Sequence, residues 1–267
     1  MKAILLFLAV FFTGAYTYAQ TPAPVPAPAI PGEGIAPVLP ACSKTDRPCV
    51  LGQIEQTALA IENKSWRDQT LRELAKTWAF EGDTDKAIAL VSKIQTPDTQ
   101  ALTIRGIGMT AAEQKFPKEK LDALFIKLRE VSETITHPPS YAIALTYVAM
   151  AQAFAGDNEG AWKTAADMKN DALRHKAFAE TAEIQAQKGD YKAAMHSIEQ
   201  IESEAFRNKA LNVVSKIFAG NGLYQEALDA VAKITNAYKK SEGMQYVLDA
   251  QKPREAKKEF KTEGAAE

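Results

Sequence analysis

The sequence of 267 residues predicts an all-α fold, a solenoid built from stacked antiparallel helix hairpins. The first observation is a 33-residue unit that occurs twice in succession, at 174–206 and 207–239, with nine identical positions. The second is a recurring glycine turn with small and apolar residues at fixed distances from it. The third is that no segment inside the unit alternates like a β-strand.

Each unit is expected to hold two helices, which we call helix A and helix B, joined by a turn. In the unit 174–206, Gly189 can adopt the left-handed conformation that ends helix A. Asp190 can then cap the free N–H groups that begin helix B. The same Gly-Asp pair occurs in two earlier units, but Leu223 replaces the aspartate in the last one, so that this cap is lost.

Three kinds of residue recur at fixed distances from each turn glycine. Seven residues before it stands a small residue, which lets the two helices of a hairpin approach closely: Ala75, Ala149, Ala182 and Ser215. Five residues after it stands an alanine: Ala87, Ala161, Ala194 and Ala227. Twelve residues after it stands a large apolar residue: Ile94, Met168, Ile201 and Ile234.

These spacings resemble the tetratricopeptide repeat family. In that family a small residue of helix A is followed twelve positions later by an alanine of helix B, as at Ala75 and Ala87. Its turn and the aromatic residue after the turn match Gly189-Asp190-Tyr191. The resemblance covers roughly residues 50–250 and implies a right-handed superhelix with helices A lining a concave groove. The period of 33 rather than 34, and the missing proline at the end of the unit, depart from the family.

The N-terminal residues 1–19 are expected to be a secretory signal peptide. Lys2 precedes an apolar run, and Thr17-Tyr18-Ala19 offers small residues where a signal peptidase reads the chain. Cleavage after Ala19 would make the protein periplasmic or secreted, with no stable membrane span left. The alternative is that this segment is retained as an N-terminal anchor, although it is short for one.

Residues 20–41 are rich in proline and alanine and predict an extended linker. Cys42 and Cys49 follow it and are the only cysteines, so in an oxidising compartment we predict a disulfide that closes a small loop before the first helix. No metal site is expected there, because two thiolates without a nearby histidine are too few ligands.

The solenoid is expected to occupy residues 42–250, beginning with a lone helix B at 50–63 and ending with a lone helix at about 240–250. Between them lie five hairpins, at about 67–95, 99–139, 140–172, 173–206 and 207–239. The second hairpin is eight residues longer than the others, which is either a partner-binding insertion or, by preference, a tolerated change of length. The charged tail 251–267 is expected to be disordered.

No residue pattern predicts an enzyme or a cofactor. The three histidines, His137, His175 and His196, lie in different units and are expected to be ordinary surface residues. No phosphate-binding glycine loop and no serine in a nucleophile elbow is present. A net charge of −1 gives no bulk attraction to nucleic acid or to an anionic membrane.

A binding surface is therefore the remaining hypothesis, and the repeat spacing selects its residues. The helix A positions expected to line the groove are Gln69, Arg72, Lys76, Leu102, Arg105, Met109, Glu113, Ile143, Thr146, Met150, Phe154, Lys176, Glu183, Lys209, Asn212 and Lys216. They form basic ends around an apolar, methionine-containing middle, which suits a docked peptide that carries carboxylates. An equally supported interpretation places Leu102, Ile143 and Phe154 in the core between repeats.

The leading functional hypothesis is an exported, non-catalytic scaffold that binds a protein or an extended peptide in this groove. The sequence does not identify that partner. Two alternatives remain: a self-assembling structural protein of the cell envelope, which would be a homo-oligomer, and an accessory module of a cell-wall enzyme complex.

Overall fold

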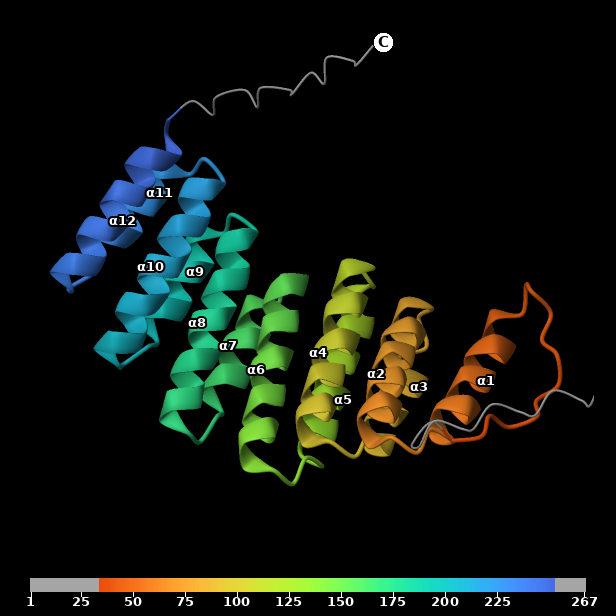
Figure 1. Cartoon of the computed structure of the whole chain (residues 1–267). Helices are drawn as coiled ribbons and strands as arrows, with labels where there is room; N and C mark the ends of the chain where they lie inside the picture. The colour runs from red at the N-terminus through yellow and green to blue at the C-terminus, as the bar shows by residue number, and fades with distance from the viewer. Residues whose placement is uncertain (1–33, 253–267) are drawn as a thin grey trace, which may run out of the picture. The chain divides into compact units, whose positions relative to one another are not determined.

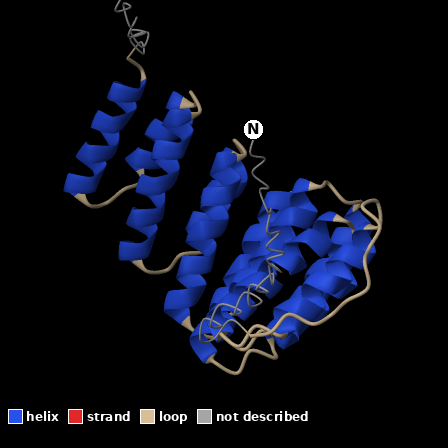
Figure 2. Ribbon diagram, turned by 45° about the vertical axis from the view of Figure 1, so that its right-hand side comes forward, coloured by secondary structure: helices blue, strands red, loops and turns tan. Residues whose placement is uncertain are grey.

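The computed structural model of the protein describes residues 34–252 (Figure 1). The expected signal peptide, the linker up to residue 33 and the tail from residue 253 lie outside these residues. Residues 34–252 hold twelve α-helices, one short 3-10 helix and no β-strand (Figure 2). The all-α prediction is confirmed for this part of the chain.

The helices alternate between the two expected kinds. Those at helix A positions are α2 (Lys64–Phe80), α4 (Pro97–Glu113), α6 (Pro138–Ala155), α8 (Asp171–Gln187), α10 (Glu204–Gly220) and α12 (Ala237–Ala250). Those at helix B positions are α1 (Arg47–Leu59), α3 (Thr84–Ala89), α5 (Lys118–Ser132), α7 (Asn158–Ala166), α9 (Tyr191–Glu199) and α11 (Tyr224–Ala232). The 3-10 helix η1 (Val91–Lys93) continues α3.

Each even-numbered helix packs against the next even-numbered helix and, from α2 to α10, against the odd-numbered helix that follows it. Figure 1 shows this succession from α2 through α4, α6, α8 and α10 to α12. Successive even-numbered helices run parallel, as contacts between their N-terminal parts indicate. Asp68 near the start of α2 accepts the backbone N–H of Thr96, at the start of α4, at 2.8 Å. Asn208 near the start of α10 donates to Thr235, just before α12, at 2.8 Å.

The turns form as their residues predict. Gly82, Gly156, Gly189 and Gly222 all have a positive φ, the left-handed conformation that glycine adopts without a Cβ clash. Asp83, Asp157 and Asp190 each accept a backbone N–H of the helix that follows, at 3.0–3.1 Å. Leu223 makes no such bond, as expected. These local signals fix where each hairpin bends.

The second hairpin bends one residue earlier than the sequence suggests. Pro117 suits the first turn of a helix and so predicts the turn at Phe116-Pro117, but the residue with a positive φ is Lys115, 33 residues after Gly82. Its helix α5 has 15 residues, whereas α7, α9 and α11 have nine each. The extra length of this unit therefore lies mainly in its helix B and in the loop that follows.

The small residues of the repeat lie where the two helices of a hairpin meet. Ala75, Ala149, Ala182 and Ser215 are fully buried, and so are Ala87, Ala161, Ala194 and Ala227. The large apolar residues that follow, Ile94, Met168, Ile201 and Ile234, are also buried. The core therefore runs between helices along the described chain, because each hairpin covers the apolar face of the next.

The two cysteines lie at disulfide distance, with Cys42 before α1 and Cys49 in its first turn. The Cα atoms of Cys42 and Cys49 are 5.8 Å apart, within the range that a disulfide bridges. Asp46 caps α1 by accepting the backbone N–H of Cys49 at 3.0 Å. The side-chain amide of Gln53 also donates to the carbonyl oxygen of Pro40, so the entering segment is held against α1.

The expectation that all three histidines lie on the surface is wrong for His175. His137 and His196 are exposed, but the His175 side chain on α8 is only 7% exposed and lies beside the ring of Phe206, with centroids 5.7 Å apart. Its position corresponds to the buried Asn208, 33 residues later. Phe206 of the next helix A packs on His175, and Thr235 in the loop before α12 bonds Asn208, so the polar stretch around each residue in sequence says little about its burial.

Candidate binding surfaces on helices α1, α2 and α4

The first candidate surface is a hollow of about 480 Å³ between α2 and α4, which we call the A-face hollow. It is lined by Arg72, Glu73, Lys76, Leu102, Arg105, Gly106, Met109, Thr110 and Glu113. Six of these are positions that the repeat spacing selects; Glu73, Gly106 and Thr110 are not. Each of those three directly follows a selected residue, so a selection of helix A positions extended by one residue would have included them.

Charges of both signs meet in the A-face hollow. The Glu73 carboxylate accepts from Lys76 Nζ at 2.7 Å and from Arg72 Nε at 3.0 Å. The hydrogen bond from Lys76 lowers the pKa of Glu73, and the bond from Arg72 adds to this, whereas partial burial opposes it. Glu73 therefore stays ionised and offsets part of the positive charge of its two partners.

Arg105 is the cation of the hollow that is held by an aromatic ring instead of a carboxylate. Its guanidinium carbon lies 5.5 Å from the centroid of the Tyr147 ring, a cation–π distance. Close by, Gly106 leaves room for the aliphatic part of Lys76, because a Cβ at Gly106 would lie 2.7 Å from Lys76 Cγ. The hollow thus presents the exposed Arg105 next to the apolar side chains of Leu102 and Met109.

The other selected positions do not join this hollow. Thr146 and Met150 are buried in α6, where the Thr146 hydroxyl donates to the Ala142 carbonyl at 3.0 Å. Ile143 and Phe154 are half-buried and pack against the core, whereas Leu102, which does line the hollow, is exposed. Lys176 and Lys209 are exposed, Asn212 and Glu183 are half-buried, and Lys216 bonds Glu242 at 2.8 Å. The basic and apolar positions are therefore spread over several helices.

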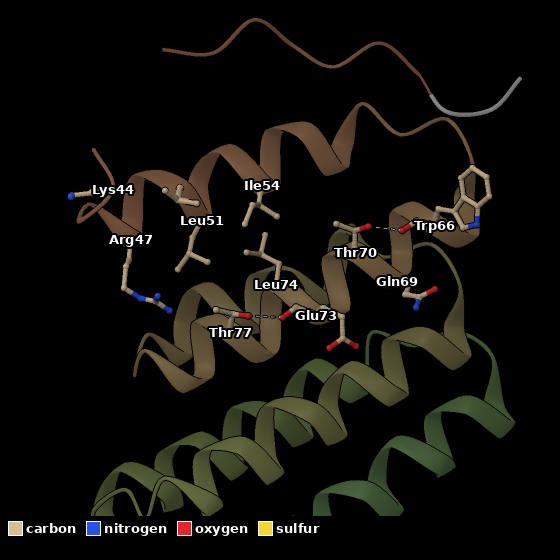
Figure 3. A pocket seen from close by; sticks show the side chains of 11 residues that line it. Lys44, Arg47, Leu51, Ile54, Trp66, Gln69, Thr70, Glu73, Leu74 and Thr77 are labelled. Carbon is tan, nitrogen blue, oxygen red and sulfur yellow. Dashed lines mark hydrogen bonds between the residues drawn. The ribbon is translucent and has the colours of Figure 1, made fainter. Parts of the chain in front are cut away.

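The second candidate surface is a groove of about 730 Å³ between α1 and α2, which we call the entry groove (Figure 3). It is lined by Lys44, Arg47, Val50, Leu51, Ile54, Trp66, Gln69, Thr70, Glu73, Leu74 and Thr77. Only Gln69 was selected from the sequence. The repeat spacing did not select the other positions, because the groove lies where the described helices begin, and α1 has no described helix A before it.

The entry groove has an apolar floor and two different ends. Figure 3 shows Leu51, Ile54 and Leu74 pointing toward one another between the two helices. Lys44 and Arg47 lie at one end and Trp66 at the other. Arg47 Nε donates to Glu81, the residue after α2, at 2.8 Å, so the start of α1 lies beside the end of α2. Trp66 is 49% exposed, an edge position of the hairpin rather than a core one.

The described residues form neither a cluster of metal ligands nor a membrane-spanning helix. Within residues 34–252, no group of three or more His, Cys, Asp or Glu side chains is arranged to hold a metal ion. Over the same residues, no helix combines the length and the apolar character that a membrane crossing needs.

The sequence matches no protein-family model, and a comparison with curated proteins found no match. The function therefore has to be inferred from the two surfaces themselves.

Proposed function

We propose that the protein is a non-catalytic scaffold, a tetratricopeptide-like solenoid of helix hairpins, that binds an extended segment of another protein on its even-numbered helices. The A-face hollow is the principal contact. The single observation that supports this most is that six positions chosen by repeat spacing, from two different units, line one hollow. Residues 33 apart that converge on a concave surface are what a repeat-protein binding face requires.

The chemistry of the hollow favours a peptide that combines carboxylates with an apolar side chain. Leu102 and Met109 offer an apolar patch, and a methionine adapts its shape to what it contacts. Arg105 can bond a carboxylate in a bidentate manner, whereas Arg72 and Lys76 already share Glu73. The volume of about 480 Å³ is within the range of natural binding pockets and suits a few side chains. No bond is made or broken in such binding.

The proposed compartment is the periplasm or the extracellular space. The signal-like N-terminal sequence supports export. The cysteine pair at disulfide distance is compatible with it, because disulfides persist in oxidising compartments. The partner segment is then a peptide or a protein tail of the same compartment.

The experiment is a selection from a displayed library of random short peptides, followed by affinity measurements on the enriched sequences. We expect enrichment of acidic peptides with leucine, methionine or phenylalanine. The double variant Arg105→Glu/Met109→Asp should bind them at least about tenfold more weakly, which corresponds to about 1.4 kcal/mol. The matched control is Lys192→Glu/Ile126→Asp, which makes the same kinds of change at exposed positions on α9 and α5. Equal affinity of the two double variants, or no enrichment of acidic peptides, would contradict the proposal.

A further inference from the structure

The described helices begin on one kind of helix and end on the other. The first, α1, is a helix B that packs against α2. The last, α12, is a helix A that packs against α10 and α11. Every helix A from α4 to α10 lies between a preceding and a following helix A. Within residues 34–252, α2 has no helix A before it and α12 has none after it, so each has a face that its counterparts bury.

The entry groove is the face of α2 that no helix A covers within residues 34–252. Ile54 of α1 and Thr70 of α2 line the groove, where Ile54 is 39% exposed and Thr70 is half-buried. The corresponding residues of the next unit, Ala87 of α3 and Thr103 of α4, are fully buried, and α4 packs against α2. The groove therefore has the position that a preceding helix A would fill, with α1 as its helix B and α2 as its successor.

The exposed apolar side of α12 is the corresponding uncovered face of the last described helix. Met244 is 44% exposed and Leu248 is 58% exposed. The corresponding residues of α10, Leu211 and Ser215, are 1% and 0% exposed, because α11 and α12 pack against α10. Two large apolar side chains thus stand at positions that are covered in the preceding unit.

We propose that the entry groove receives helix α12 of a second copy of this chain. The docked α12 would run parallel to α2, as successive helices A do within one chain, so it continues an interface that the fold already uses. Met244 and Leu248 would then contact the apolar floor around Ile54. Two copies joined in this way would extend the succession of even-numbered helices from one chain into the next.

The charges of the two ends fit this orientation. In a parallel arrangement, the C-terminal end of the docked α12 reaches the end of the groove where Lys44 and Arg47 lie (Figure 3). The C-terminal carbonyls of a helix carry negative partial charge. The Asp249 carboxylate in the last turn is paired with Lys252 at 2.6 Å, so the carbonyls supply the negative end. At the opposite end, the exposed Tyr238 of α12 comes to the end of the groove that holds Trp66.

The contact is heterologous, since one copy contributes its groove and the other its last helix. Such a contact leaves a free groove at one end of the pair and a free α12 at the other. Further copies can therefore add, and the assembly grows with concentration instead of stopping at a symmetric dimer. The entry groove shares only Glu73 with the A-face hollow, and neither Ile54 nor Leu248 lines that hollow, so the inference is tested independently of the peptide binding proposed above.

The test measures the mass of the full chain by sedimentation velocity over a range of concentrations. Leu248→Lys removes the apolar side of α12, and Ile54→Lys places a charge on the floor of the groove. The matched control is Ile126→Lys on α5, where the native side chain is 60% exposed and outside both surfaces. We expect the wild type and the control to grow in mass with concentration, and both end variants to stay at the mass of one chain. Circular dichroism checks that all variants keep their helix content.

Mixing the two end variants gives the sharper result. The Ile54→Lys variant keeps an intact α12, and the Leu248→Lys variant keeps an intact groove, so one contact can form between them. The mixture should therefore reach the mass of two chains and stop there. A wild type that stays at one chain at every concentration overturns the proposal. So does an end variant that assembles like the wild type, or a mixture that stays at one chain.

Discussion

Gly156 and Gly52 are two glycines whose added Cβ would meet nothing within 4 Å, yet they serve opposite purposes. Gly156 has φ of +90° at the turn after α6, where a side chain would strain the backbone. Gly52 lies inside α1 with ordinary helical geometry, where glycine only adds freedom to the unfolded chain. Because space is open at both sites, the backbone angle alone decides the effect of an alanine.

We predict that Gly156→Ala lowers the free energy of unfolding by about 1 kcal/mol, the cost of a left-handed L-residue. Its control, Gly52→Ala, should raise the free energy of unfolding by about 0.5–1 kcal/mol, since alanine favours the helix interior. Urea denaturation followed by circular dichroism measures both. An unchanged or raised free energy of unfolding for Gly156→Ala would show that the turn does not depend on the left-handed conformation.

At the scale of the elements, each of two hairpins holds a polar pair between its two helices, at corresponding positions. Thr164 Oγ1 donates to Gln152 Oε1 at 2.7 Å, and Ser197 Oγ donates to Gln185 Oε1 at 2.7 Å. Each pair links a helix A to its own helix B. In the last hairpin the same two positions hold Phe218 and Ala230, both fully buried. The interface between the two helices thus tolerates either chemistry, provided that both partners are of one kind.

We predict that Ser197→Ala lowers the free energy of unfolding by about 1–3 kcal/mol, because it leaves one buried and one partly buried polar atom without partners. The atoms concerned are Gln185 Oε1 and Trp162 Nε1, which donates to Ser197 Oγ at 2.7 Å. The control is Ser215→Ala, whose hydroxyl bonds only the Asn212 carbonyl of its own helix. Chemical denaturation that shows an equal loss in both variants would argue against the importance of the hydrogen bond between helices.

At the scale of the whole molecule, exposed ion pairs link successive helices B. Lys127 of α5 bonds Asp85 of α3 at 2.6 Å, and Lys233 after α11 bonds Glu199 of α9 at 3.2 Å. Exposed pairs of this kind contribute little each, so the stability of the described hairpins rests mainly on the buried contacts between them.

Several carboxylates nevertheless make the stability depend on pH. The pKa values of Glu73, Asp83 and Glu242 are lowered, chiefly by hydrogen bonds from Lys76, Lys86 and Lys216. A group whose pKa is lower in the folded state stabilises the fold above its unfolded pKa. That contribution is lost as the pH falls through the folded pKa.

We therefore predict that the melting temperature falls as the pH decreases from about 5 to about 3. The loss should be smaller in high salt, because these partly or fully exposed pairs are screened. Differential scanning calorimetry across this range, at two salt concentrations, provides the measurement. A melting temperature that rises on acidification would contradict the stabilising role of these ionised carboxylates.

Much of the fold and part of the candidate site could be predicted from the chain. The turns at Gly82, Gly156, Gly189 and Gly222 were predictable because a positive φ is a property of a single residue. The A-face hollow was predictable in outline because positions 33 apart lie on corresponding helix faces. Spacing failed for Thr146 and Met150, which are buried, and it did not reveal the entry groove. His175 is also buried, although its residue type predicted a surface position.

The sequence by itself determined the helical class, the hairpin turns and their caps, because these depend on interactions within a few neighbouring residues. Only the tertiary structure decided which side of each helix stays exposed, because burial depends on the helices that pack on either side. Leu248 and Ser215 illustrate this difference: they occupy the same position of the repeat, but only Ser215 is covered. The helices that would cover Leu248 do not follow α12 within residues 34–252.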